Sequence, residues 1–213
     1  MKRRPVVPGA RYKLRQPGTV AFAAALLLVL IGAAALHITT RLNTVASAMV
    51  FLVYVACVWL IPAGRLPGFH RMALWTFLTA VLLHVAYELT QSIFYTHFTQ
   101  PGYTYVELVF MLWGATVGDG VIALALFFVV TVMRGGRWEW PWGWRSVVLT
   151  MALALVVQVA VEIGALRAGL WAYNAQMPRL PVVNVGLTPA LQMPLLMPLT
   201  LWLAAQVSCA PPG

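Results

Sequence analysis

Three acidic side chains inside strongly apolar stretches are the residues of this sequence best suited to chemistry. The chain contains five acidic residues, and Glu88, Asp119 and Glu162 each lie within a long apolar run that holds no Lys or Arg. An ionised carboxylate in the hydrocarbon of a bilayer costs several kcal/mol. We therefore expect these acids to face the interior of the protein, where they are protonated, share protons or hold a cation.

Polar side chains recur at helical spacing beside these acids. His84 precedes Glu88 by four residues, and Gln158 precedes Glu162 by four residues. Residues four apart lie on the same face of a helix, so each acid is expected to share its face with a polar neighbour. The same faces and the adjoining helix are expected to carry Gln91, Tyr95, Thr116, Thr188 and Gln192.

The depth of these groups in the membrane predicts a shared site. Glu88 and Glu162 fall near the outer ends of their apolar runs, and Asp119 falls near the middle of its run. The connection over residues 167–184 is long and rich in Pro, Trp, Tyr and Asn, which is typical of a lid or a binding loop. The sequence therefore predicts a polar pocket in the outer half of the membrane, beneath this loop.

The elements that position these groups are predicted to be membrane-spanning helices. Of the 213 residues, 62% are hydrophobic and 9% charged, whereas a soluble domain carries roughly 25% charged residues. The apolar runs are continuous and do not alternate, so an all-α polytopic helical bundle is expected and not a β-barrel. Six runs approach or exceed the roughly 20 residues that a span needs: 19–38, 44–61, 72–94, 106–133, 146–166 and 185–207.

The distribution of positive charge predicts that both termini are cytoplasmic. With the N-terminus inside, 11 of the 14 Lys and Arg residues fall on the inner side and 3 on the outer side. The organisation is then a basic tail over 1–18, one transmembrane domain over 19–207 and a short tail over 208–213, in a bacterial inner membrane. The net charge of +9 is assigned to lipid head groups and not to nucleic acid. A signal peptide cleaved near residues 33–35 is the alternative for the first run.

Two spans are expected to be irregular. Span 106–133 is longer than the bilayer requires and is predicted to tilt or to bend at its glycines, and span 185–207 is predicted to be broken or strongly kinked at its prolines. The glycines are Gly114, Gly118 and Gly120, and the prolines are Pro189, Pro194 and Pro198. Four tryptophans before span 146–166 are interpreted as an interfacial belt: Trp138, Trp140, Trp142 and Trp144.

Acid–base catalysis on an apolar molecule is the first functional hypothesis. Burial favours the neutral form of a carboxylic acid, so one acid can donate a proton while another group removes one. The predicted acid–base groups are Glu88, Asp119 and Glu162, with His84 tuning them. The predicted substrate-binding residues are Gln91, Tyr95, Gln158, Trp171, Tyr173, Asn174 and Gln192. A carbocation is expected to be shielded by the rings of Tyr87, Tyr95, Trp113, Trp171 and Tyr173.

A resemblance adds to this hypothesis. The polar pattern in the spans, together with the motif W-x-Y, M-P and V-G-L-T-P-x-L-Q over residues 171–192, resembles small six-span bacterial inner-membrane proteins to which no activity is assigned. The intramembrane His and Glu are also similar to those of the emopamil-binding-protein-like isomerases and the membrane-embedded lycopene cyclases. The resemblance implies proton-driven rearrangement of a lipid or isoprenoid-like substrate, and it assigns no individual residue.

Other interpretations of the same residues remain open. His84 and Glu88 can be a pair that fixes helix packing, Asp119 can bond to a neighbouring backbone, and Glu162 can pair with Arg167 at the surface. Together, the side chains of His84, Glu88, Asp119 and Glu162 can also hold a divalent cation. A non-enzymatic subunit or assembly factor of a membrane complex, and a proton- or cation-coupled carrier, are the competing functions. No GxGxxG or P-loop motif is present, and no particular cofactor is predicted.

Overall fold

The described part of the chain is a bundle of long antiparallel helices. The structure is a computed structural model that describes residues 68–138 and 141–208. Spans 19–38 and 44–61, both predicted tails and the two cysteines lie outside these residues. The elements are α3 (Phe69–Gln91), η2 (Ser92–Phe94), α4 (Thr96–Thr99), α5 (Tyr105–Met133), α6 (Trp144–Arg167) and α7 (Leu187–Ser208). No strand occurs within the described ranges.

The four long helices match the last four predicted spans within three residues at every end. Each is long and apolar enough to cross a membrane: Phe69–Phe94, Tyr105–Met133, Trp144–Arg167 and Leu187–Ser208. The chain is accordingly a multi-pass helical membrane protein. The six-span count and the side on which the termini lie stay predictions. Of the arginines described, Arg167 and Arg179 lie at the end where α6 finishes and α7 begins, which we call the Arg167 end.

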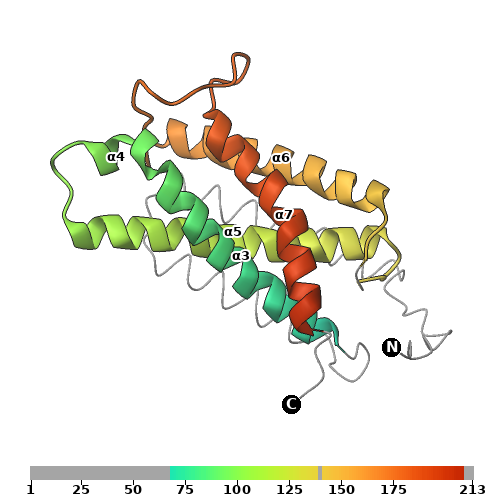
Figure 1. The fold of residues 1–213 in the computed structure, drawn as a ribbon. Helices are drawn as coiled ribbons and strands as arrows, with labels where there is room; N and C mark the ends of the chain where they lie inside the picture. The colour runs from blue at the N-terminus through green and yellow to red at the C-terminus, as the bar shows by residue number, and fades with distance from the viewer. Residues whose placement is uncertain (1–67, 139–140, 209–213) are drawn as a thin grey trace.

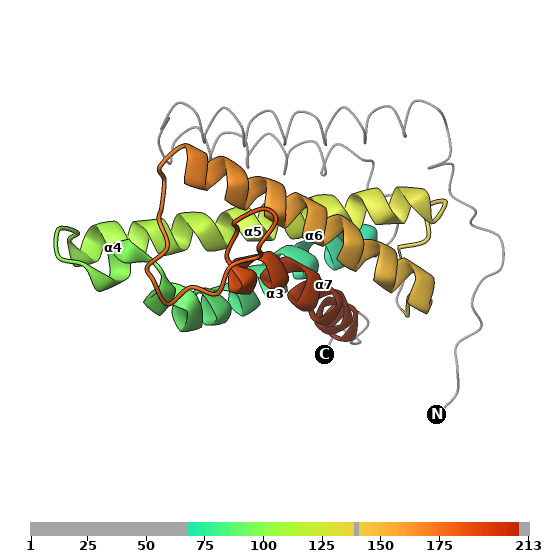
Figure 2. The ribbon, with the colours of Figure 1, turned by 90° about the horizontal axis from the view of Figure 1, so that it is seen from above.

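Helix α3 holds the bundle together because it packs against both α5 and α7. Helix α7 in turn packs against α6, whereas α5 and α6 touch each other much less. In Figure 1, α3 and α7 run obliquely across α5, and Figure 2 shows the bundle from above. The result is an arc of four helices in the order α5, α3, α7 and α6.

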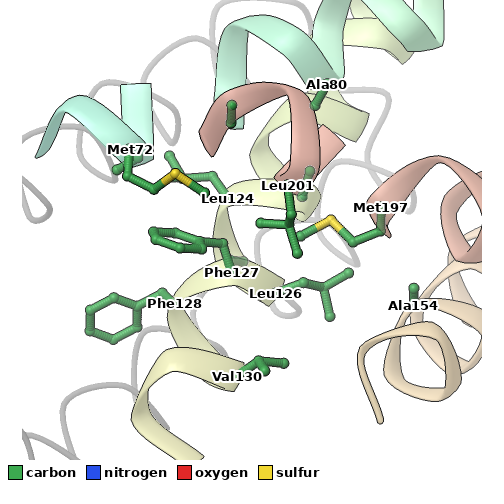
Figure 3. Close-up of a cluster of buried hydrophobic side chains, with 14 of the residues drawn as sticks. Met72, Ala80, Leu124, Leu126, Phe127, Phe128, Val130, Ala154, Met197 and Leu201 are labelled. Carbon is green, nitrogen blue, oxygen red and sulfur yellow. The ribbon is translucent and has the colours of Figure 1, made fainter. Parts of the chain in front are cut away.

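The apolar core lies in the half of the bundle remote from the Arg167 end. Phe69 and Phe127 are fully buried and stack with their ring centroids 5.6 Å apart, and Met197 and Leu201 of α7 belong to the same cluster (Figure 3). Inside a bilayer, side-chain packing and hydrogen bonds, and not exclusion of water, hold helices together. This core therefore fixes the relative positions of α3, α5 and α7 beneath the polar residues.

A glycine sets the closest approach of α3 to α5. A Cβ atom on Gly120 would lie 2.7 Å from Val81 Cγ2 and 2.8 Å from Phe77 Cε2, which is closer than real contacts allow. Gly114 and Gly118 have no such neighbour among the described atoms. Helix α5 runs unbroken through all three glycines, and the role of Gly120 is close packing beside Asp119.

The prediction that span 185–207 is broken is wrong. Helix α7 is continuous from Leu187 to Ser208 with Pro194 and Pro198 inside it. Pro189 stands in the first turn, where a helix has no use for the missing N–H. Helix α7 therefore presents one continuous face to α3 and α6.

The tryptophan belt is only partly correct. Trp144 is 71% exposed, as an interfacial residue would be. Trp142 is buried, lies parallel to Phe127 with centroids 6.4 Å apart, and has the guanidinium of Arg134 4.7 Å above its ring. Trp138 packs on Gly68. Both rings belong to the apolar core, Trp142 as a buried member and Trp138 as a partly buried residue packed against it.

The connection from α6 to α7 folds back onto the segment that follows α3. Thr96 N–H donates to the carbonyl of Ala172 at 2.9 Å, and Asn174 N–H donates to the carbonyl of Phe94 at 2.9 Å. Tyr95 and Tyr173 form an antiparallel bridge between the two segments. Residues 168–186, here called the roof loop, are therefore fixed across the Arg167 end by backbone hydrogen bonds.

Candidate functional site

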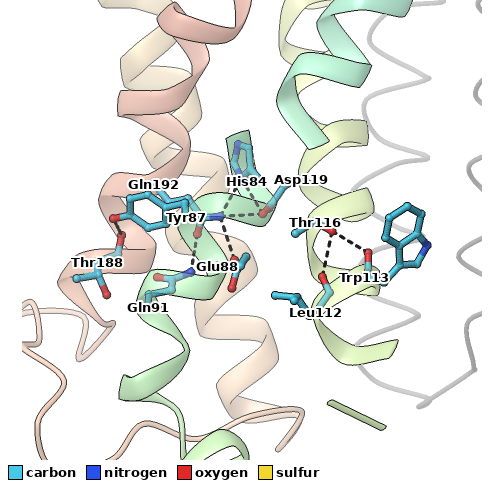
Figure 4. Close-up of polar contacts among 10 residues, drawn as sticks. All are labelled: His84, Tyr87, Glu88, Gln91, Leu112, Trp113, Thr116, Asp119, Thr188 and Gln192. Atoms are coloured by element: carbon cyan, nitrogen blue, oxygen red, sulfur yellow. Dashed lines mark hydrogen bonds and ion pairs between the residues drawn. The ribbon is translucent and has the colours of Figure 1, made fainter. Parts of the chain in front are cut away.

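Five polar side chains from three helices meet in the bundle. They are His84, Glu88 and Gln91 of α3, Asp119 of α5 and Gln192 of α7, and we call them the Gln192 cluster (Figure 4). All except Glu88 are buried, and Glu88 is half-buried. The predicted convergence of these residues is therefore present in the structure.

One amide group joins two carboxyl groups. Gln192 Nε2 donates to Glu88 Oε1 at 2.9 Å and to Asp119 Oδ2 at 3.0 Å, which uses both of its hydrogens. Its Oε1 accepts from Gln91 Nε2 at 2.9 Å. The carboxyl oxygens of Glu88 and Asp119 share one donor atom and so lie within two hydrogen-bond lengths of each other.

His84 completes the cluster, and its ring contacts two neighbours through one nitrogen. His84 Nδ1 lies 2.8 Å from Asp119 Oδ2 and 2.8 Å from Gln192 Nε2. With its hydrogen on Nδ1 the ring donates to Asp119, and with its hydrogen on Nε2 it accepts from the Gln192 amide. In the first of these tautomers Nε2 is an acceptor, and Nε2 is buried without a partner among the described residues.

The sequence produces this cluster through spacing and close packing. His84, Glu88 and Gln91 stand at i, i+4 and i+7 on α3, which places them on one face. Gly120 allows that face to approach Asp119. The hydroxyl of Tyr87 donates to the carbonyl of Thr188 at 2.9 Å and fixes the start of α7 against α3.

A second acidic group lies under the roof loop. Glu162 of α6 is 3% exposed, and its Oε2 accepts from the Tyr173 hydroxyl at 2.5 Å and from Trp171 Nε1 at 3.1 Å. Tyr95 packs beside them, with its ring centroid 5.4 Å from that of Tyr173 and 6.4 Å from that of Trp171. We call Glu162, Trp171, Tyr173 and Tyr95 the Glu162 cluster.

The two clusters interact electrostatically through the phenol of Tyr95. Burial raises the pKa of Tyr95, and the carboxyl groups of Glu162 and Glu88 raise it further. Burial also raises the pKa of Tyr173, and the charge and hydrogen bond of Glu162 add to that effect. Both phenols therefore stay protonated at neutral pH, and Tyr173 remains able to donate to Glu162.

The carboxyl groups of Glu88, Asp119 and Glu162 are not neutralised by any described Lys or Arg. Glu88 interacts electrostatically with both Asp119 and Glu162, and none of the three forms an ion pair with a described Lys or Arg. Among the described residues, His84 is the one basic side chain that forms an ion pair with any of them. Glu88 Oε1, Asp119 Oδ2 and Glu162 Oε2 accept the hydrogen bonds above, and the side chain of Gln91 also bonds to Glu88. The site can thus give and accept protons at three carboxyl groups.

The remaining predicted residues have different outcomes. Gln158 is buried on the same face of α6 as Glu162, and its Oε1 has no hydrogen-bond partner among the described residues. Asn174 lies in the roof loop, where its Nδ2 donates to the carbonyl of Ile93 and its Oδ1 accepts from Gln176 N–H. Both polar atoms of its side chain are thus hydrogen-bonded to backbone groups. Trp113 is 57% exposed and points away from the Gln192 cluster, so its predicted shielding role is wrong (Figure 4).

Two alternative roles considered for the acids do not match the contacts. Glu162 bonds to Trp171 and Tyr173 and makes no ion pair with Arg167. Asp119 bonds to the side chains of His84 and Gln192 and to no backbone group of the described helices. Within 68–138 and 141–208, no three His, Cys, Asp or Glu side chains are placed to hold a metal ion together.

Sequence reasoning missed two contributors. The guanidinium of Arg179 lies 5.4 Å from the centre of the Tyr173 ring, and its Nη1 donates to Asn184 Oδ1 at 3.3 Å. Gly186 allows the roof loop to close, because a Cβ atom there would lie 2.8 Å from Met177 Sδ. No helical spacing marks either residue. The richness of residues 167–184 in Pro, Trp, Tyr and Asn pointed to the loop that holds Arg179, whereas Gly186 was placed in span 185–207.

Comparisons with known proteins add nothing to this geometry. No protein-family model, curated protein or solved structure matches the chain.

Proposed function

We propose that this chain is a membrane-embedded acid–base enzyme of the bacterial inner membrane that rearranges a lipid or isoprenoid-like molecule. The observation that supports the proposal is the bonding of two carboxyl groups, on α3 and α5, to the single amide nitrogen of Gln192, with His84 bonded to one of them. A structural contact between helices needs one such bond. A cluster with two acids and an imidazole is what proton transfer requires.

We give the groups different parts in the reaction according to their burial. Glu88 is half-buried, whereas the other members of the Gln192 cluster are buried, so in this proposal Glu88 is the group that meets the substrate. Asp119 and His84 are buried behind it and act on it through Gln192. Glu162 offers a second acidic group within electrostatic range of Glu88.

The reaction we propose is a proton-balanced isomerisation. The carboxylic acid of Glu88 gives its proton to one carbon of a substrate double bond, which forms a C–H bond and leaves a carbocation at the neighbouring carbon. The carboxylate of Glu162 then removes a proton from the next carbon, which forms the new double bond. No electron is lost or gained, and the two acids exchange one proton through their neighbours to reset. The rings of Tyr95, Trp171 and Tyr173 stabilise the cation.

The test compares lipid extracts of cells. Cells with the chain deleted are complemented with wild type, Glu88→Gln or Glu107→Gln, and membrane levels of each protein are matched. Glu107 lies in an exposed capping box with Thr104 at the start of α5, so it is a matched control for the same substitution. We expect Glu88→Gln to reproduce the lipid profile of the deletion and Glu107→Gln to restore that of wild type. A wild-type profile with Glu88→Gln, where the deletion differs, refutes the proposal.

A non-enzymatic subunit of a membrane complex is the second candidate. Helix α6 favours this candidate. Only 22% of its most apolar 18-residue stretch is buried, and it packs little against α5, so much of its apolar surface is available to a partner. If the chain is such a subunit, a protein partner should co-purify with it in equal amount in a mild detergent, and Glu88→Gln should not release that partner. Under this candidate the lipid profile follows the presence of the partner and not the carboxyl group.

A further inference from the structure

The unpartnered atoms of the site are hydrogen-bond acceptors. Gln158 Oε1 and Gln91 Oε1 are buried without a partner in the described part of the chain, on side chains that are 3% and 2% exposed. His84 Nε2 is also buried without a described partner, and it accepts in the tautomer whose Nδ1–H donates to Asp119. Buried polar atoms of native proteins are almost always hydrogen-bonded, so these three unpaired atoms, two of them amide oxygens that can only accept, point to donors supplied by a bound molecule.

Gln158 is the most informative of the three. It stands one turn before Glu162 on the buried face of α6, so the two side chains are neighbours. Leu would fill a comparable volume there without leaving a polar atom unpaired. The amide oxygen therefore lowers the stability of the free protein, and a bound donor would offset that loss.

The charge of the site restricts what can bring those donors. Glu88 and Asp119 share the amide nitrogen of Gln192, Glu162 interacts electrostatically with both, and none of the three forms an ion pair with a described Lys or Arg. A phosphate or carboxylate head group would meet repulsion in a medium of low dielectric and would find acceptors where it needs donors. A hydroxyl or an ammonium group has the opposite properties, since both donate hydrogen bonds and neither is negative.

We infer that the molecule bound at this site carries a head group that donates hydrogen bonds and has no negative charge, as in a long-chain alcohol or amine, and that Gln158 accepts one of those hydrogen bonds. The inference rests on the proposed function, because it names the head group of that substrate. It separates alcohols and amines from phosphorylated lipids of the same chain length.

The experiment measures binding with three probes of one chain length. The purified full chain in a neutral detergent is titrated with hexadecanol, hexadecylamine or hexadecyl phosphate, and the midpoint of thermal unfolding is followed. We expect the alcohol or the amine to raise the midpoint of wild type and the phosphate to leave it unchanged. A response to the amine alone assigns a cationic head group, and a response to the alcohol assigns a neutral one.

Gln158→Leu tests the residue itself. Because the amide oxygen is unpaired, the ligand-free variant should unfold at the same temperature as wild type or higher, whereas its affinity for the alcohol or amine should fall about five- to tenfold, the value of one hydrogen bond. Gln158→Met is the second variant if Leu packs poorly. Gln206→Leu, at an exposed position of the neighbouring helix α7, is the matched control and should bind as wild type does.

Three results overturn the inference. They are equal stabilisation by the phosphate, no stabilisation of wild type by any probe, and unchanged affinity in both Gln158 variants. These results are distinct from failure of the proposed function, which Glu88→Gln decides in cells. If Glu88→Gln alters the lipid profile but the Gln158 variants bind the probes as wild type does, the enzyme proposal is supported and the inference about the head group is refuted.

Discussion

Replacement of Gln192 by Met tests whether the cluster is assembled as described. Met has nearly the same length and shape as Gln but lacks the amide, so three hydrogen bonds to Glu88, Asp119 and Gln91 are lost without a large cavity. Side-chain hydrogen bonds between membrane helices contribute about 0.6 kcal/mol each on average and at most about 1.7 kcal/mol. Gln192 is 1% exposed, so water does not replace the lost bonds. We expect the free energy of unfolding to fall by about 2 kcal/mol.

The measurement is equilibrium unfolding of the purified chain in bicelles with an ionic detergent as denaturant. Gln206→Met is the control, since Gln206 is exposed on the same helix and its change should stay within about 0.5 kcal/mol of wild type. A double-mutant cycle with Gln91→Met should return a coupling energy between the two amides of about 0.6 to 1.7 kcal/mol. If Gln192→Met is as stable as wild type while the control is unaffected, the hydrogen bonds assigned to Gln192 are not present in the membrane.

Two further predictions concern helix packing and pH. Gly120→Ala should destabilise the protein by about 1 to 3 kcal/mol in the same unfolding assay, because its Cβ would overlap Val81. Gly118→Ala should be neutral or stabilising, because its Cβ would have no described atom within 4 Å. Tyr95 and Tyr173 have raised pKa values, so the stability they contribute is present below pH ~10 and is lost as the pH rises above it. Replacing both by Phe should flatten the stability–pH curve above pH ~10, and an unchanged slope there would contradict the burial of the two phenols.

Much of the transmembrane architecture could be predicted because it depends on local sequence. Apolar length fixed the last four spans to within three residues, and i, i+4 spacing placed His84 beside Glu88 on one face. The approach of Asp119 and Gln192 to that face depends on which helices pack together. Spacing within one helix does not contain that information, and the match of depths along different helices was the only indication of it.

The roof loop and the prolines show where local reasoning fails. Proline was expected to break or strongly kink span 185–207, and the break does not occur, because packing against α3 and α6 keeps α7 continuous at Pro194 and Pro198. Asn174 was predicted to bind substrate, and that role stays a prediction. Its amide bonds to backbone groups at Ile93 and Gln176, and the contact with Ile93 depends on how two segments 81 residues apart meet.

The anchoring of the roof loop offers a practical handle on this protein. Its contacts with the α3 end involve backbone atoms near Tyr95 and Tyr173, while Val182 near its tip is 96% exposed. With Cys57 and Cys209 replaced, a cysteine-linked fluorophore or spin label at position 182 would report on any motion of the loop while leaving its attachment points chemically intact. Whether the loop stays closed over Glu162 then becomes measurable without knowledge of the compound that binds.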